Sequence, residues 1–211
     1  GDPPEGVAEA DVHLGDLGSA AELVQLIHRV QKERVPFTLH DVPGFPGTKR
    51  VGASERVTIA VAAFPNGHPR SRSRSQDIDT LLAKQAAGAN LAISQLFFEA
   101  DEYLSFADAA RAAGVTMRML PGIMPILSMG RLKRVLELTG EAPPQSLIAR
   151  LEGADSPEAA SAAGIDASTT LARDLLDGGA SGLHLYTFNR SAAPLAVLGG
   201  AGLLDTTRIH A

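Results

Sequence analysis

The chain has 211 residues, of which 45% are hydrophobic, enough for one globular domain with a sizeable core. Disordered and fibrous classes are excluded, and we expect residues 1–211 to form a single domain. Lysine and arginine number 19 against 24 acidic residues, and the net charge of -5 excludes a global positive field that would attract nucleic acid or an anionic membrane. The chain has no cysteine, which excludes disulfides and thiolate metal ligands. No apolar run reaches the ~18 residues of a membrane span and no signal-peptide pattern opens the chain, so we expect a cytoplasmic protein that does not bind membranes.

The first predicted element is a helix that begins after Ser19. Residues 3–18 are rich in proline, glycine and acidic groups and predict a loop. Ser19 and Glu22 make a capping box, and apolar residues then recur at helical spacing as far as Val30. After a second loop rich in proline and glycine, residues 57–64 are almost continuously apolar. They predict a strand that is buried on both faces.

The rest of the chain alternates between helical and strand patterns. The expected helices are residues 76–87, 102–113, 129–138, 145–151, 157–177 and 191–198, and the expected strands are residues 91–98, 115–120 and 183–188. Ser75 is expected to cap the helix of residues 76–87, and Asp101 the helix of residues 102–113. Pro121-Gly122 is expected to end the strand of residues 115–120. Strands separated by helices predict repeated βαβ units, a parallel sheet and the α/β class.

Polar residues interrupt this pattern at the carboxyl ends of the predicted strands, where α/β folds carry their ligand sites. The five clusters are Asp2, residues 66–69, Gln95, residues 121–125 and residues 186–190. Gln95 lies inside an apolar strand, where an amide is costly to bury without partners. It either reads a flat heterocycle or pairs with neighbouring groups of the sheet. No Gly-x-Gly-x-x-Gly, Walker, His-x-x-x-His or Gly-x-Ser-x-Gly motif is present, so no metal site is expected.

Three further candidates each have a functional and a structural interpretation. Asp77, Thr80 and Lys84 share one helix face, which lines a ligand or, as the commoner case, faces solvent. His68 either donates to a phosphate or a ring, or is a solvated loop histidine. Arg190 either clamps a carboxylate or forms a surface ion pair.

A short basic run offers a separate reading. Arg70, Arg72 and Arg74 alternate with serines just before a predicted helix, where they could contact phosphate. The run has no interleaved aromatic residues, so a solvated loop is favoured over RNA binding.

Taken together, the clusters resemble the methylenetetrahydrofolate reductase family. The pieces that carry the resemblance occur in the family's order: residues 1–4 (GDPP), 62–69 (AAFPNGHP), 87–98 (AGANLAISQLFF), 121–126 (PGIMPI) and 182–190 (GLHLYTFNR). The family fold is an eight-stranded parallel β/α (TIM) barrel that carries FAD. The family takes a hydride from NADH or NADPH and reduces 5,10-methylenetetrahydrofolate to 5-methyltetrahydrofolate, in one-carbon and methionine metabolism.

The resemblance implies contacts to FAD and to folate. The positions that it places beside FAD are Gly1, Asp2, Ala20, Phe64, His68, Asp77, Thr80 and Lys84. Asp2 also matches an aspartate that contacts the pterin, and is the only catalytic residue that the resemblance assigns here. Gln95 matches the glutamine that recognises the pterin, and Arg190 matches an arginine near the folate. Phe64 takes the place of a frequent tyrosine, Thr80 stands where an asparagine also occurs, and Ala83 stands where some members carry an arginine.

The resemblance also implies that part of the barrel is missing from these residues. The matched pieces correspond to strands five to eight with their helices, and the family's general-acid glutamate belongs to the earlier strands. We therefore expect an incomplete barrel, the C-terminal part of a reductase that forms a homo-oligomer when complete, and little activity from residues 1–211 alone. The alternative is a non-catalytic remnant or partner module that binds flavin or folate weakly.

Overall fold

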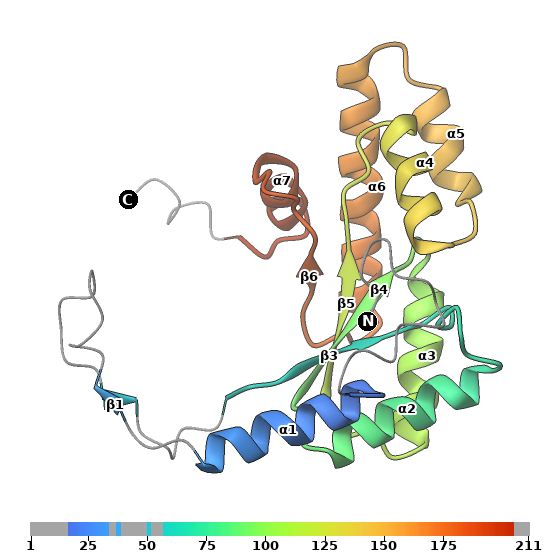
Figure 1. The fold of residues 1–211 in the computed structure, drawn as a ribbon. Coiled ribbons are helices and arrows are strands. Elements are labelled where there is room, and N and C mark those ends of the chain that lie inside the picture. The colour runs from blue at the N-terminus through green and yellow to red at the C-terminus, as the bar shows by residue number, and fades with distance from the viewer. Residues whose placement is uncertain (1–16, 34–36, 39–49, 52–56, 205–211) are drawn as a thin grey trace.

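The computed structural model describes residues 17–33, 37–38, 50–51 and 57–204. Four parallel strands form a sheet in the order β3-β4-β5-β6, and a separate antiparallel pair joins β1 to β2 (Figure 1). The strands are β1 (Phe37–Thr38), β2 (Arg50–Val51), β3 (Ala60–Ala63), β4 (Leu91–Leu96), β5 (Arg118–Ile123) and β6 (His184–Leu185). The helices are α1 (Ala20–Glu33), α2 (Arg74–Ala86), α3 (Ala100–Ala112), α4 (Met129–Thr139), α5 (Gln145–Glu152), α6 (Pro157–Asp177) and α7 (Ala192–Gly200). The predicted parallel α/β fold is confirmed.

One face of the parallel sheet carries the main core. Val61 and Ala63 of β3, with Ala92 of β4, are buried on this face, against apolar residues of α2, α3 and α6. On the opposite face, Ala60 and Ala62 are exposed. The prediction that the first parallel strand is buried on both faces was therefore wrong. Its small apolar residues suit a two-sided strand, but the described residues cover only one side.

The largest core side chain ties α3 to the sheet. The Tyr103 hydroxyl donates to the carbonyl oxygen of Met119 at 2.9 Å, and its ring stacks on Phe97 at 5.6 Å between centroids. Burial raises the pKa of Tyr103 to about 12, so the phenol stays a neutral donor. This contact anchors the middle of β5 to the helical layer.

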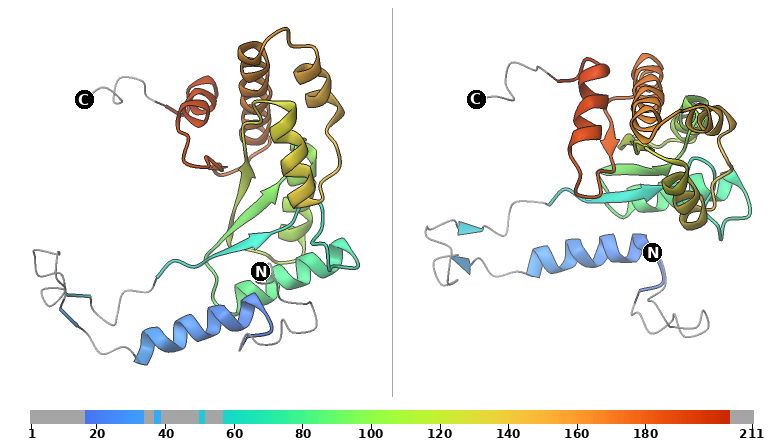
Figure 2. Two further views of the ribbon diagram at one scale, coloured as in Figure 1. Left: turned by 45° about the horizontal axis from the view of Figure 1, so that its top comes forward. Right: turned by 90° about the horizontal axis from the view of Figure 1, so that it is seen from above.

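A second apolar cluster lies beyond the carboxyl ends of the strands. Its buried members are Leu96, Met124, Ile126, Leu132, Val135, Leu147 and Leu151. Helices α4 and α5 stand beside α6 above the sheet and bring these residues together (Figures 1 and 2). Gly164 of α6 is required here, because a Cβ at this position would overlap the carbonyl oxygen of Ile126. The carboxyl end of β5 is thus held against α6.

Two helix caps differ from the sequence prediction. Ser73, not Ser75, caps α2 by accepting from the Gln76 N–H at 3.2 Å. Glu99, not Asp101, is the cap residue of α3, since its own N–H donates to the Glu102 carboxylate at 2.9 Å. In both cases the helix begins about one half-turn earlier than predicted, because an extended residue with a suitable partner was available upstream.

Two strand ends also differ. Pro121-Gly122 does not end β5 but belongs to it, and Gly122 pairs with Leu96 across an irregular register in β4. Proline is tolerated where the ladder is already interrupted, since its missing N–H is not needed there. β6 is only two residues long, and its pairing with β5 ends at Leu185, opposite Ile123, the last residue of β5. Further along the predicted strand, Phe188 and the following Asn189 have positive φ angles of 48° and 60°. Those angles lie outside the extended region that a strand requires.

Candidate functional site at the carboxyl edge of the sheet

The loop after β3 brings an aromatic ring and a histidine together. Phe64 and His68 pack edge to face, with 4.7 Å between ring centroids. The loop is fixed on its outer side by Asn66, whose Nδ2 donates to Glu102 at 2.9 Å and to Glu141 at 2.7 Å. Burial raises the pKa of Glu141, as does nearby Glu102, while the hydrogen bond from Asn66 opposes the rise. The structure thus brings Phe64 and His68, two positions that the resemblance places beside FAD, into contact at the end of β3.

Asp77 of α2 carries an unsatisfied buried oxygen. The side chain is 7% exposed, and its Oδ1 accepts from the His68 N–H at 3.3 Å and from the Ser71 hydroxyl. Its Oδ2 is buried without a hydrogen-bond partner, in front of Gly67. A buried carboxylate oxygen without a partner is costly and marks a place where a donor from a ligand would be stabilised.

Lys84 lies about two turns further along the same helix and is also 7% exposed. Its Nζ donates to the carbonyl oxygen of Ala62 at 2.8 Å and lies 6.0 Å from the centre of the Phe64 ring. Burial lowers the pKa of Lys84, and the charge of Asp77 opposes that shift. Thr80 between them is exposed and its hydroxyl donates to the Gln76 carbonyl at 2.8 Å. The preference for a solvated helix face was therefore wrong for Asp77 and Lys84.

His68 is held as a donor at Nε2. Its Nδ1 accepts from the Arg70 N–H at 3.1 Å, which requires an unprotonated Nδ1. Burial lowers the pKa of His68, and the charge of Arg70 lowers it further, against the opposing charge of Asp77. At neutral pH the ring is uncharged and its Nε2–H is left to donate.

This arrangement predicts a pH-dependent loss of stability. Because the pKa of folded His68 lies below its ordinary value of 6.5, the unfolded chain binds the proton more readily between the two values. The contribution is present in full above 6.5 and is lost as the pH falls through 6.5 toward the lowered pKa. His68→Asn, which keeps an acceptor for Arg70, should flatten the fall in unfolding free energy measured with urea between about pH 7.5 and about pH 5.5. Arg70→Gln should reduce it, and an equal fall in wild type and His68→Asn would contradict this account.

Gln95 lies on the less covered face of β4. The strand alternates, with Ser94 buried and Gln95 half-buried. The Gln95 Oε1 accepts from the Leu96 N–H at 2.9 Å, so the interpretation of pairing with neighbouring backbone holds for the carbonyl end of the amide. Within the described residues its Nε2 makes no hydrogen bond. The side chain is thus held by one end and presents two N–H donors at the other.

A hydrogen-bond network that the sequence did not reveal holds the backbone beside Gln95. The Ser94 hydroxyl donates to the Gln95 carbonyl at 2.9 Å and accepts from the Gly122 N–H at 2.8 Å. The Tyr186 hydroxyl donates to the Ser94 carbonyl at 3.1 Å, and burial raises its pKa. These contacts connect β4, β5 and the end of β6 at the register shift. They hold the backbone beside Gln95 through contacts from β5 and from the residue after β6.

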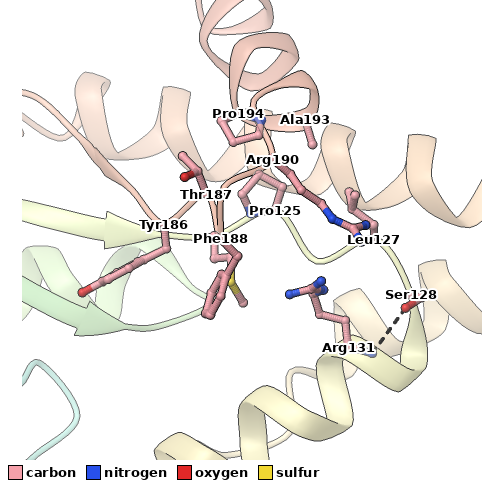
Figure 3. A pocket seen from close by; sticks show the side chains of 11 residues that line it. Pro125, Leu127, Ser128, Arg131, Tyr186, Thr187, Phe188, Arg190, Ala193 and Pro194 are labelled. Atoms are coloured by element: carbon pink, nitrogen blue, oxygen red, sulfur yellow. Dashed lines mark hydrogen bonds between the residues drawn. The ribbon is translucent and has the colours of Figure 1, made fainter.

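Arg190 lines a pocket of about 160 Å³ beyond β5 and β6 (Figure 3). The turn that carries it is closed by the Arg190 N–H donating to the Thr187 carbonyl at 3.0 Å. The surface ion pair considered for Arg190 is absent among the residues that the structure describes. Arg131 of α4 lines the same pocket and was not singled out by sequence.

The remaining predicted positions do not join these groups. Gly1 and Asp2 lie outside the described residues, so their predicted roles stay predictions. Ala20 is the exposed first residue of α1. Arg74 of the basic run is used structurally, since its guanidinium donates to Ser105 at 3.1 Å and to the Pro65 carbonyl at 3.3 Å. Arg74 therefore begins α2, and the solvated-loop interpretation does not hold for this residue.

The described part of the chain contains neither a candidate metal cluster nor a candidate membrane-spanning helix. Residues 17–33, 37–38, 50–51 and 57–204 contain no group of three or more histidine or acidic side chains placed to hold a metal ion. Across the same ranges, no helix combines the length and the hydropathy needed to cross a membrane.

The comparisons with known proteins agree with the resemblance. The family model described as methylenetetrahydrofolate reductase matches residues 1–202. The probable methylenetetrahydrofolate reductase (NADPH) of Caenorhabditis elegans is 38% identical over 148 residues, which cover 69% of this chain and 22% of the relative. The probable methylenetetrahydrofolate reductase (NADH) of Oryza sativa is 32% identical over 222 residues, covering 99% and 33%. The 5,10-methylenetetrahydrofolate reductase of Escherichia coli is 31% identical over 167 residues, covering 74% and 56%.

The chain thus spans from 22% to 56% of the length of these three relatives. A solved structure, described as an uncharacterized protein from Clostridium thermocellum that binds two copies of 5-methyl-5,6,7,8-tetrahydrofolic acid, superposes with a TM-score of 0.46 and 12% identity, covering 69% of this chain and 52% of that one. With a family model that matches almost the whole chain and relatives above 30% identity, the chain belongs to the methylenetetrahydrofolate reductase family.

Proposed function

We propose that this chain supplies part of the active site of an FAD-dependent reductase that converts 5,10-methylenetetrahydrofolate to 5-methyltetrahydrofolate with NADH or NADPH. The observation that carries the proposal is the placement of three separate ligand-ready groups along one edge of a parallel sheet. The cluster of Phe64, His68, Asp77 and Lys84 follows β3, Gln95 lies on β4, and Arg190 follows β6. Family membership supports the reaction type.

The spacing of these groups supports an extended ligand arrangement. From β3 to β6 there are three strand spacings of about 4.8 Å, or roughly 14 Å across the sheet. A flavin cofactor near β3 and a folate reaching from β4 to β6 would share this edge. Chemistry at the carboxyl ends of parallel strands is the rule in α/β folds.

The residues near β3 fit the donor and acceptor pattern of FAD. Asp77 Oδ2 is a buried acceptor without a donor, which suits a sugar hydroxyl. Lys84 uses one of its N–H groups on Ala62 and His68 keeps its Nε2–H, so both have donors left for phosphate or ring oxygens. The Phe64 ring offers an apolar contact. When bound, the flavin would accept the hydride from the nicotinamide and deliver it to the folate.

The other two groups fit the two ends of a folate. A pterin edge carries donors and acceptors in alternation, and Gln95 presents free N–H donors from a side chain that the Leu96 N–H already orients. Arg190 suits a carboxylate, which folate carries on its glutamate. The chain's own residues would thus bind and orient the two partners, which is the protein's share of the work in hydride transfer.

The open face of the sheet supports the barrel interpretation. Ala60 and Ala62 are exposed on the face opposite the helices, the face that would line the inside of a β/α barrel. We place the described sheet as part of such a barrel, within one domain, in a cytoplasmic protein that assembles as a homo-oligomer. The catalytic and ligand roles proposed for Asp2, Gly1, Ala20 and Thr80 rest on the resemblance alone.

Lys84→Met tests the flavin site. The substitution keeps the length of the side chain but removes the donor to the Ala62 carbonyl and the cation near the buried Asp77 carboxylate, so the unfolding free energy should fall by about 1–3 kcal/mol. The affinity for FAD should fall about 10-fold, as expected for the loss of one charge-assisted hydrogen bond. The measurements are urea unfolding and fluorescence titration with FAD. Lys133→Met on the exposed face of α4 is the matched control and should leave both values unchanged.

The proposed reaction is tested by product analysis. The reductase of which this chain supplies part is purified and incubated with FAD, NADH or NADPH and 5,10-methylenetetrahydrofolate, and 5-methyltetrahydrofolate is measured by mass spectrometry. Formation of product that requires FAD supports the reductase. Retention of FAD without product would favour the non-catalytic module. Salt-sensitive RNA binding that is lost when Arg70, Arg72 and Arg74 are changed to alanine would favour the interpretation of the basic run as an RNA-binding segment.

A further inference from the structure

The loop after β3 is held at its start, at its tip and at its end. At the start, the Arg74 guanidinium of α2 donates to the Pro65 carbonyl at 3.3 Å. At the end, the His68 N–H donates to the Asp77 carboxylate, also of α2. The tip is Asn66, whose side chain points away from α2 and contacts two other segments. The contacts of Asn66 therefore decide where the middle of the loop lies.

Asn66 joins two carboxylates through one amide nitrogen. Its Nδ2 donates to Glu102 of α3 at 2.9 Å and to Glu141, just after α4, at 2.7 Å. An amide nitrogen carries two N–H groups, so each carboxylate receives its own hydrogen bond. Burial raises the pKa of Glu141 and the charge of Glu102 raises it further, while the hydrogen bond from Asn66 lowers it. Asn66 thus holds together two segments whose charges repel each other.

Glu141 is fixed in place by the end of α4. Gly140 ends the helix with a φ of 72°, and its N–H donates to the Leu136 carbonyl at 2.9 Å. The Glu141 N–H donates to the Thr139 hydroxyl at 3.3 Å, and that hydroxyl donates to the Val135 carbonyl at 2.9 Å. Because Val135 is buried in the second apolar cluster, Glu141 is an acceptor that the core of the protein holds in position.

We infer that Asn66 and Glu141 are positioning residues, which hold the loop after β3 so that the His68 ring keeps its orientation. The loop turns at Gly67, whose φ is 97° and whose N–H donates to the Phe64 carbonyl at 3.2 Å. His68 directly follows this turn and packs against the Phe64 ring, so a displacement of Asn66 is passed on to His68. The inference rests on the proposed function only for the ligand that His68 binds.

The first readout is the pKa of His68 in the purified reductase of which this chain supplies part. Modification of His68 by diethyl pyrocarbonate is followed by mass spectrometry of its peptide as a function of pH. In Glu141→Leu the loop should loosen, and the pKa of His68 should rise toward 6.5, because burial is the largest cause of its lowering. Loss of the Glu141 charge alone would lower the pKa of His68, so the two effects have opposite signs.

The second readout is the affinity for FAD, measured by fluorescence titration. Glu141→Leu and Asn66→Ala should each weaken FAD binding about 5-fold, as expected for the loss of one neutral hydrogen bond. The urea midpoint should move by less than about 0.5 M, because both hydrogen bonds lie at the surface. Combining the two substitutions should weaken binding no further than Asn66→Ala does, since Glu141 acts through Asn66. Glu141→Gln keeps an acceptor for Asn66 and should bind FAD as wild type does.

Glu152→Leu is the matched control, because Glu152 is exposed at the end of α5 and its loss removes the same charge. It should leave the pKa of His68 and the affinity for FAD unchanged. The inference is overturned if Glu141→Leu leaves the pKa of His68 at or below the wild-type value, or if the double variant shows the sum of the two single losses. Failure of the proposed function has a different signature. Wild type would then bind no FAD, while the pKa of His68 would still respond to Glu141→Leu and support the positioning role.

Discussion

Gln95→Glu is expected to lower kcat/KM for the folate half-reaction by about 100-fold, close to 2.7 kcal/mol of lost transition-state binding. The substitution keeps the Oε1 acceptor that holds the Leu96 N–H, so the strand keeps its geometry. It replaces the free N–H donors by a second acceptor and adds a negative charge on a half-buried face. A pterin edge that fits an amide then loses its hydrogen-bond donor and faces a negative charge, and both changes weaken folate binding.

Reduction of the flavin by NADH or NADPH should change by less than about 3-fold in the same variant, because the cluster after β3 is untouched. Both half-reactions are followed separately by rapid mixing. Gln145→Glu is the matched control, since Gln145 is exposed at the start of α5 and its amide reaches only the Pro143 carbonyl. Equal losses in the two half-reactions of Gln95→Glu would remove the assigned role.

Gly122→Ala is expected to destabilise the protein by about 3 kcal/mol. A Cβ at this position would overlap the Ser94 carbonyl oxygen and lie 2.8 Å from Cε2 of Tyr186. Both neighbours are fixed, because the Tyr186 hydroxyl donates to that same carbonyl and Ser94 accepts from the Gly122 N–H. The strand would have to separate from β4, and the backbone that orients Gln95 would move with it.

The measurement is urea unfolding, together with the affinity for 5-methyltetrahydrofolate. Gly130→Ala gives a control of opposite sign, because Gly130 lies inside α4 with no atom within 4 Å of an added Cβ. It should stabilise the protein by roughly 0.5–1 kcal/mol through helix propensity. A Gly122→Ala variant as stable as wild type would show that the β4–β5 register shift tolerates a side chain.

The long helices could be predicted from sequence because their signals are local. Ser156 followed by Pro157 marks the start of α6, and the observed helix has the predicted bounds. Strand ends could not be predicted in the same way. β5 continues through Pro121-Gly122 only because the partner strand is irregular at Ser94, which is a property of the pair and not of either segment.

The candidate site also combines residues that local sequence motifs indicate with residues whose role depends on segments distant in the sequence. Family motifs indicated Phe64, His68, Gln95 and Arg190, and membership of the family is confirmed. Helical periodicity could not show that Asp77 is buried, because its cover comes from the loop that contains Ser71. Arg131 and Arg190 are far apart in the sequence, and only the fold brings α4 and the turn after β6 to one pocket. The one local signal for Arg131 was a cation in the first turn of a helix.

The absorbance of FAD bound to the purified reductase of which this chain supplies part, followed under anaerobic conditions, tests the central claim most directly. The account predicts that NADH or NADPH bleaches the bound flavin and that 5,10-methylenetetrahydrofolate then restores its colour, with 5-methyltetrahydrofolate formed in equal amount. It also predicts that Gln95→Glu keeps the first step and slows the second. A flavin that is bleached but not restored by the folate, or a protein that retains no FAD, would contradict the claim that this edge of the sheet carries out the reduction.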